Sequence, residues 1–306
     1  MTWGFQAVNQ NGQVLVSSET RNLHFVGKAY LDRVVKQTDS YGGIRQYAFR
    51  IACNITPMPF FTMPTSDYYA VSAVRSVAAG LWEIEVIRSG YGGQQPEVYV
   101  FCDPRGITGR PTTDYGMKVI MDDGTPSFDS RYRPLVVAGG VNVYPPSNPR
   151  VSGPGGLDPT ECRSDGGPSL APDNANTFAM PVLTDKPIYY YPSIAQAQRE
   201  FSVYRSRREC VGFNVYGGCI GYGSQENWRS TYWAFYRGGI KHVGNTVFCG
   251  WIAVEYGCNW DYKRDNSFVG IGIGGSSGQG GVWPYSNETL NLFSTPIIAA
   301  KGARYD

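Results

Sequence analysis

The chain has 306 residues, of which 17% are charged, and its formal net charge is only +2. So small a charge argues against nucleic acid or an anionic membrane as the main partner. The start of the sequence lacks a secretory signal pattern, and no apolar run approaches the roughly 20 residues needed to cross a bilayer. The 38 glycines and 22 tyrosines indicate strands joined by turns. We therefore expect a mainly β protein, made in the cytoplasm without membrane insertion.

The first predicted element is a β-hairpin over residues 4–23. Asn11 and Gly12 stand at its turn, because glycine readily takes the positive φ that a tight hairpin turn requires. The same spacing recurs without gaps over residues 116–135, where Asp123 and Gly124 stand at the turn. A fixed offset indicates an internal repeat. Two unrelated hairpins with common turn chemistry are the alternative.

Between the two hairpins, the sequence predicts a series of short strands. They are expected at residues 46–55, 70–77, 81–88 and 97–102. In the third of these, Glu83 and Glu85 alternate with apolar residues, which is typical of a half-buried antiparallel strand. Repeated short strands favour a β-sandwich or a small barrel. We expect an N-terminal β-sandwich-like unit over residues 1–105, followed by a linker over residues 106–114.

A second β-rich unit is expected over residues 115–306, opened by the second hairpin. Residues 145–174 are rich in Pro, Gly, Ser and Asp, which predicts a long irregular excursion. Residues 193–209 follow Pro192 and contain helix formers, so they predict a short helix, although their centre fits a strand equally well. The remaining part is aromatic and glycine-rich. The fold expected is thus two β-sandwich-like units with at most one or two short helices.

Few residues suggest catalysis or metal binding. The two histidines, His24 and His242, have no Cys, Asp or Glu at ligand spacing, so we interpret both as structural. The glycine pattern over residues 270–275 is not followed by a helix, as dinucleotide binding requires. Glu83 and Glu85 form a very weak carboxylate pair. We predict no catalytic, cofactor-binding or metal-binding residue, and no cofactor.

The seven cysteines form an odd set without a C-x-x-C pair. The spacings fit neither common zinc pattern. Free buried thiols are the favoured interpretation, and disulfides formed late in an extracellular particle are the alternative.

Two groups of residues stand out as candidates for other roles. The first is aromatic and fits either a stacking platform for sugars or packing in a core or interface. Its members are Trp228, Tyr232, Trp233, Tyr236, Trp251 and Trp260. The second group consists of hairpin residues, whose turns and ion pairs give a structural role. Its members are Asn11, Gly12, Asp123, Gly124, Phe128, Asp129 and Arg131.

The second hairpin carries a resemblance to a known class of proteins. Residues 116–119 read GMKV and residues 128–135 read FDSRYRPL, and together they resemble a hairpin of the minor tail proteins of tailed bacteriophages. The first hairpin departs from this pattern, with VSSE at residues 16–19 in place of FDSR. Residues 231–239 and 283–292 are also similar to phage structural proteins.

The resemblance implies a virion protein of the tail tip, baseplate or tail fibre, with no enzyme activity. Its implied partners are other phage tail proteins and further copies of itself, with a trimer favoured. It would be made in the host cytoplasm and assembled into the tail. A carbohydrate- or receptor-binding module on the particle, contacting a host surface glycan or protein, is the alternative. A hydrolase acting on a surface polysaccharide is the least favoured.

Overall fold

The computed structural model describes most of the chain. The described residues are 6–8, 14–17, 22–38, 43–90, 93–109, 111, 114–146, 175–180, 186–213, 219–265, 287–291 and 293–306. The backbone alone is described for residues 6–8, 14–17, 38, 199–213, 219–234, 256–265 and 287–291.

The described chain is mainly β, which confirms the predicted fold class. The strands are β1 (Gln6–Val8), β2 (Val14–Ser17), β3 (His24–Thr38), β4 (Ile44–Ala52), β5 (Met58–Phe61), β6 (Tyr69–Ala78), β7 (Leu81–Ser89), β8 (Val98–Cys102), β9 (Lys118–Ile120), β10 (Pro126–Asp129), β11 (Val137–Val143), β12 (Asn176–Ala179), β13 (Pro187–Tyr190), β14 (Gln196–Phe213), β15 (Cys219–Val243), β16 (Thr246–Asp265), β17 (Asn287–Asn291) and β18 (Thr295–Lys301). The helices are the short 3-10 turns η1 (Pro104–Gly106) and η2 (Gly302–Tyr305).

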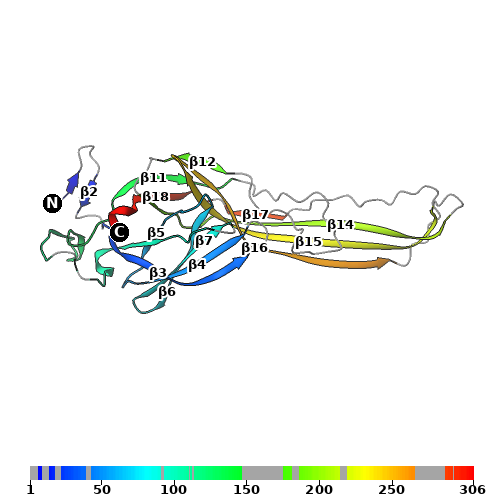
Figure 1. The fold of residues 1–306 in the computed structure, drawn as a ribbon, viewed down its shortest axis with the longest axis horizontal. Helices are drawn as coiled ribbons and strands as arrows, with labels where there is room; N and C mark the ends of the chain where they lie inside the picture. Colours follow the sequence, from blue (N-terminus) through cyan, green and yellow to red (C-terminus); the bar gives the residue numbers. More distant parts are fainter. Residues whose placement is uncertain are drawn as a thin grey trace.

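One large sheet contains most of the strands. Its order is β11-β18-β13-β5-β8-β3-β4-β7-β6-β15-β14-β17, and β16 pairs with both β15 and β12. The first half of β3 pairs with β8 and the second half pairs with β4, so this strand belongs to both halves of the sheet. The two halves enclose a common core and form a sandwich-like head (Figure 1).

The core of the head draws on both halves of the sheet. Phe61 and Val100 come from β5 and β8, and Phe49 and Ile84 come from β4 and β7. All four are at most 2% exposed. Alternate residues on the same strands, such as Tyr99, belong to a second buried cluster that includes a residue of η2. Several strands of the head are therefore buried on both faces.

The sheet does not divide at residues 106–114, where the sequence suggested a linker. β13 from the expected second unit pairs with β5 from the expected first unit, and β15 pairs with β6. One core thus contains strands from both sides of the expected boundary. Pairing between strands far apart in the sequence leaves no trace in local composition, so it could not be predicted from local patterns.

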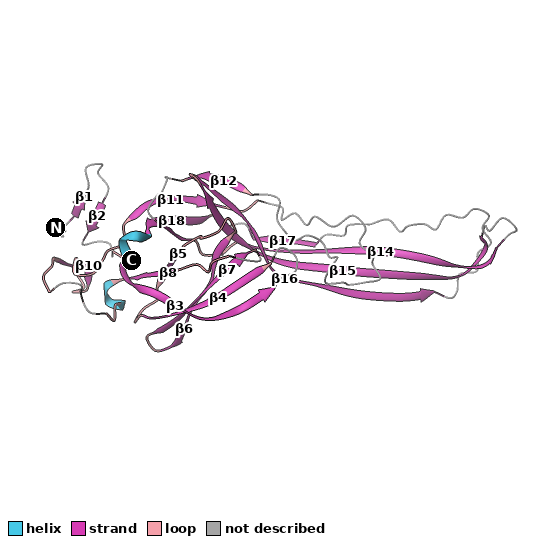
Figure 2. Cartoon of the chain, viewed as in Figure 1, coloured by secondary structure: helices cyan, strands magenta, loops and turns pink. Residues whose placement is uncertain are grey.

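Both predicted hairpins are present, as β1 with β2 and β9 with β10. They lie at the end of the head opposite β14 and β15 (Figures 1 and 2). Gly124 has a φ of 76°, as the predicted turn requires, and Pro126 is the first residue of its strand. Asn11 and Gly12 lie outside the described residues.

The expected helix over residues 193–209 is wrong, and the strand alternative is correct. β14 pairs with β15 from Gln196 to Phe213. A long ladder satisfies the backbone groups of this segment, and tertiary pairing overrides the local preference of Ala197 and Gln198 for a helix. The expected excursion over residues 145–174 lies almost wholly outside the described residues and stays a prediction.

Candidate functional site

A three-stranded β-ribbon is the most prominent feature outside the head. β14, β15 and β16 leave the head together and extend well beyond it as one layer of described strands (Figures 1 and 2). At about 3.3 Å per residue, the 18 residues of β14 span about 60 Å. The 25 residues of β15 run without interruption from the ribbon into the head.

The base of the ribbon is fixed in the head. Tyr236 is 1% exposed, and Trp251 is fully buried. The indole N–H of Trp251 donates to the carbonyl oxygen of Pro146 at 2.8 Å. The hydroxyl of Ser193 donates to the carbonyl oxygen of Gly238 at 2.8 Å. Because these buried polar groups are hydrogen-bonded, the base is anchored by specific contacts as well as by apolar packing.

The register of the ribbon gathers aromatic positions on one face. Residues directly opposite each other in an antiparallel ladder share a face, and so do alternate residues along a strand. Opposite Tyr232 stand Phe201 on β14 and Cys258 on β16. Three further rows share this face: Arg199 with Ala234 and Tyr256, Val203 with Ser230 and Trp260, and Arg205 with Trp228 and Tyr262. We call these four rows the aromatic face.

The opposite face of the ribbon is polar by the same register. Its four matching rows are Glu200 with Trp233 and Gly257, Ser202 with Thr231 and Asn259, Tyr204 with Arg229 and Asp261, and Ser206 with Asn227 and Lys263. Six of twelve positions are aromatic on the aromatic face, against two of twelve on this polar face. The ribbon is therefore amphipathic across its thickness.

The register divides the six aromatic candidates that the sequence suggested. Trp228, Tyr232 and Trp260 belong to the aromatic face. Tyr236 continues that face into the head core, whereas Trp233 belongs to the polar face. Trp251 is wholly inside the head. Burial removes Tyr236 and Trp251 from any platform on the surface of this chain, so their role is packing.

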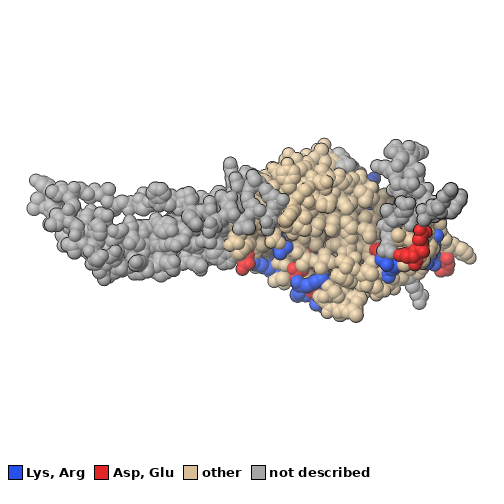
Figure 3. Space-filling view, turned by 180° about the vertical axis from the view of Figure 1, so that it is seen from behind, with Lys and Arg blue, Asp and Glu red and all other residues tan. Residues whose placement is uncertain are grey.

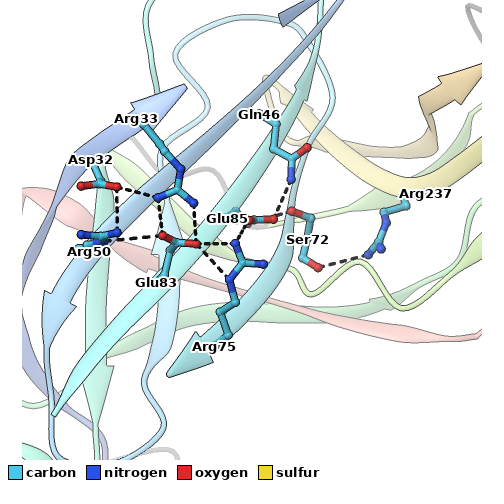
Figure 4. Close-up of polar contacts among 9 residues, drawn as sticks. All are labelled: Asp32, Arg33, Gln46, Arg50, Ser72, Arg75, Glu83, Glu85 and Arg237. Carbon is cyan, nitrogen blue, oxygen red and sulfur yellow. Dashed lines mark hydrogen bonds and ion pairs between the residues drawn. The ribbon is translucent and has the colours of Figure 1, made fainter. Parts of the chain in front are cut away.

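An ion-pair network covers Glu83 and Glu85 on β7 (Figure 4). Both residues are buried, at 1% and 6% exposure, so β7 is not the half-buried strand that was expected. Arg33 donates to Glu83 at 2.6 Å and Gln46 donates to Glu85 at 2.7 Å. One guanidinium nitrogen of Arg75 lies 2.5 Å from each of the two carboxylates. The side chains from β3, β4 and β6 thus form a polar layer over this strand.

The network determines the charge state of Glu83. Hydrogen bonds from Arg33 and Arg75, together with their positive charges, lower the pKa of the Glu83 carboxyl to about 2. The carboxylate is therefore ionised at neutral pH. A general acid needs a carboxyl whose pKa is raised towards the working pH. This arrangement fits a structural ion-pair network better than an acid–base site.

His24 joins the second hairpin to the head. Its ring is fully buried, and Nδ1 lies 2.9 Å from the carbonyl oxygen of Asn22. The backbone N–H of Asp129 donates to Nε2 at 3.2 Å. A neutral ring that is protonated on Nδ1 satisfies both contacts, and burial lowers the pKa of His24. The ring also packs on Phe128, with 5.4 Å between the centroids.

The remaining hairpin candidates have structural contacts. The Asp129 carboxylate accepts from the Arg131 side chain at 2.6 Å and 2.9 Å, and these hydrogen bonds lower the pKa of Asp129. The Asp123 carboxylate accepts from the backbone N–H of Thr125 at 2.9 Å. These contacts are the turns and ion pairs that the sequence suggested.

Charge on the head is distributed in separate groups. In Figure 3 the charged side chains gather along one edge of the head and at its end away from the ribbon, and the middle of this side carries none. A second network joins Lys28, Glu97, Lys186 and Asp306, with Lys186 lying 2.6 Å from Glu97. Cations and anions are mixed here, so the network does not form the one-sided basic surface that nucleic-acid binding requires.

Within the described ranges, no three His, Cys, Asp or Glu side chains gather as a metal site. Three cysteines whose side chains are described, Cys53, Cys102 and Cys249, are free and buried, as the sequence favoured. The described part of the chain contains no helix with the length and apolar character that a membrane crossing needs. The glycine pattern over residues 270–275 lies outside the described residues.

Comparison with protein-family models, curated proteins and solved structures gives no significant match to this chain. The function is therefore inferred from the geometry of the described residues and from the sequence of the second hairpin.

Sequence reasoning missed the partners of Glu83 and the existence of the ribbon. Arg33 and Arg75 are far from each other in the sequence and meet only because β3, β4, β7 and β6 are consecutive in the sheet. The alternation of Glu83 and Glu85 indicated one polar strand face. Two carboxylates buried on one face require cations, so this pattern was the signal in the sequence for nearby arginines.

Proposed function

We propose that this chain is a non-enzymatic structural component of a tailed-phage virion, placed at the tail tip, baseplate or tail fibre. The observation that carries the proposal is the amphipathic ribbon, which extends from a well-packed head. The resemblance of residues 116–135 to phage minor tail proteins supplies the virion setting. In this proposal the chain is made in the host cytoplasm and is assembled into the tail beside other tail proteins.

The instability of a narrow β-ribbon on its own supports this proposal. A narrow sheet gains little from its own ladder in water and needs a second layer on its apolar face. Large contiguous apolar patches are rare on soluble monomers and mark interaction sites. Subunits of a larger assembly use such elements as contacts with adjacent subunits.

The polar clusters of the head support a non-enzymatic role. Glu83 is held ionised by arginines, and Asp129 is bonded to Arg131. Replacing Glu83 or Glu85 by Gln, or Asp129 by Asn, should therefore leave unchanged any polysaccharide turnover that the particle shows. Loss of turnover in one of these variants at normal particle yield would contradict the non-enzymatic assignment.

Analysis of purified particles tests the proposal. We expect the chain in tails, at a copy number that fits the tail symmetry, and we expect an antibody label at the distal end of the tail. Particles from a phage that lacks the chain should have incomplete or non-adsorbing tails. Complete, infectious particles that contain no copies of the chain would overturn the proposal.

A receptor-binding module is the second candidate, and the aromatic face favours it. Trp228, Tyr232 and Trp260 provide rings of the type that stack on sugars. Adsorption to host cells should then fall when Trp228 is changed to Ala, and a Trp233→Ala change on the opposite face is the matched control. Unchanged adsorption in the Trp228→Ala particle, at normal assembly, would exclude glycan binding through this face.

A further inference from the structure

The aromatic face of the ribbon points to a particular partner. We infer that this face packs against the same face of another copy of the chain, so that neighbouring ribbons form the interface of a homo-oligomer. The inference rests on the proposed function, because it specifies the surface and the partner through which assembly occurs.

The aromatic face is continuous with the head core. Along β15 the face runs from Trp228 through Tyr232 to Tyr236, and along β14 it reaches Ala197. Tyr236 is 1% exposed and Ala197 is 4% exposed, because the head covers them. Beyond the head, the described strands supply no second layer over this face (Figure 2). A sheet with one apolar face is stable when another layer covers it.

The aromatic face is large enough for a stable interface. Six aromatic residues occupy the aromatic face. An aromatic side chain buries about 150–250 Å² when it is fully covered, and a stable interface buries about 800 Å² per partner. Six such residues therefore suffice for a stable interface. A monomer with this face uncovered would also have an apolar patch larger than most soluble monomers tolerate, which is about 300–600 Å².

The charges on the aromatic face are compatible with a second copy of it. In the four rows the charged residues are Arg199 and Arg205 on β14, and β17 places Glu288 beside Arg199 at the head end. The next row towards the tip contains Arg207, Glu226 and Arg264. The central strand carries no charge in the four rows, so a second copy can pack along it without placing like charges against each other, and Glu226 and Glu288 can lie opposite arginines of that copy. Such compatibility with itself is the requirement of a symmetric interface.

The test compares two double variants of the full chain by light scattering and sedimentation. Tyr232→Lys with Trp260→Lys places two charges on the aromatic face. Thr231→Lys with Asn259→Lys places the same two charges one residue away, on the polar face. The wild type and the polar-face variant should form the same oligomer. The aromatic-face variant should dissociate at least about a hundredfold more readily, because large buried aromatics dominate interface affinity.

A second, uncharged double variant shows whether weaker association is caused by misfolding. Trp228→Gln with Tyr262→Gln adds no charge and should also weaken association, while the near-ultraviolet circular dichroism of the head stays as in the wild type. A wild-type chain that is monomeric at every concentration, or equal dissociation of both lysine variants, would overturn the inference. The proposed function would survive that result if particles still contained the chain, since the face would then cover a different partner.

Discussion

The head and the ribbon differ in how the faces of their strands are covered. The head covers both faces of several strands with its own residues, and even Glu83 and Glu85 are covered by polar side chains from neighbouring strands. The ribbon continues β14, β15 and β16 beyond the head, and its described part is one layer with an aromatic face and a polar face. The difference shows that the head builds a core from its own strands, whereas the described strands of the ribbon form a single layer with unlike faces.

The largest effect is expected from a change in the head core. Trp251→Ala removes a fully buried ring and its hydrogen bond to Pro146, which should lower the free energy of unfolding by about 3–5 kcal/mol. Urea unfolding followed by circular dichroism measures this loss. Phe293→Ala is the control, because that ring is 54% exposed. Equal losses in both variants would mean that the head core is not the main source of stability.

A smaller effect is expected from the polar layer over β7. Glu83→Gln removes an ionised acceptor of two arginines and should cost about 1–3 kcal/mol. The pKa of Glu83 is lowered to about 2, so its contribution is complete above its unfolded pKa of about 4.3 and is lost as the pH falls towards 2. Unfolding at several pH values should therefore show a weaker acid dependence in the variant. Glu255→Gln, at an exposed position, should behave as the wild type.

The stability of the β9–β10 hairpin should depend on pH through His24. Burial lowers the pKa of His24, and neutral Nε2 accepts the Asp129 N–H. The contribution of His24 is therefore complete above its unfolded pKa of about 6.5 and is lost as the pH falls below that value. The hydrogen-exchange protection of β9 and β10, measured relative to the intrinsic exchange rate at each pH, should fall in this range. A His24→Asn variant, which cannot titrate there, should show no such change; an equal loss of protection in it would assign the effect elsewhere.

The smallest effect on the stability of the head is expected from substitutions in the ribbon. Tyr232→Lys with Trp260→Lys should change the unfolding free energy of the head by less than about 0.5 kcal/mol, because both positions lie beyond the head. The measurement is urea unfolding under dissociating conditions, where no partner contributes. A loss as large as that of Trp251→Ala would show that head and ribbon unfold as one unit.

The sequence was informative where structure is local. Asp123 and Gly124 identified a turn, and the strands around residues 46–55 and 81–88 followed from alternation. The ribbon was not predicted, because its strands are defined by pairing between distant segments. Ala197 and Gln198 favour a helix locally, but both pair with β15 in the long ladder instead.

The candidate site was only partly visible in the sequence for the same reason. Trp228, Tyr232 and Trp260 were recognised as unusual, but Trp233 and Phe235 interrupt the alternation along β15 and conceal it. Only the pairing with β14 and β16 shows which aromatics share a face. The network around Glu83 likewise needed the strand order to bring Arg33 and Arg75 together.

The uninterrupted course of β15 has a mechanical consequence. A pull on the tip of the ribbon is transmitted along one covalent strand into the buried surroundings of Tyr236 and Ile240 without passing through a loop. Force along the strand axis acts on the flanking ladders in shear, so many hydrogen bonds bear the load together rather than one after another. The ribbon can therefore serve as a stiff tether, whose strength is set by how firmly its base is held in the head.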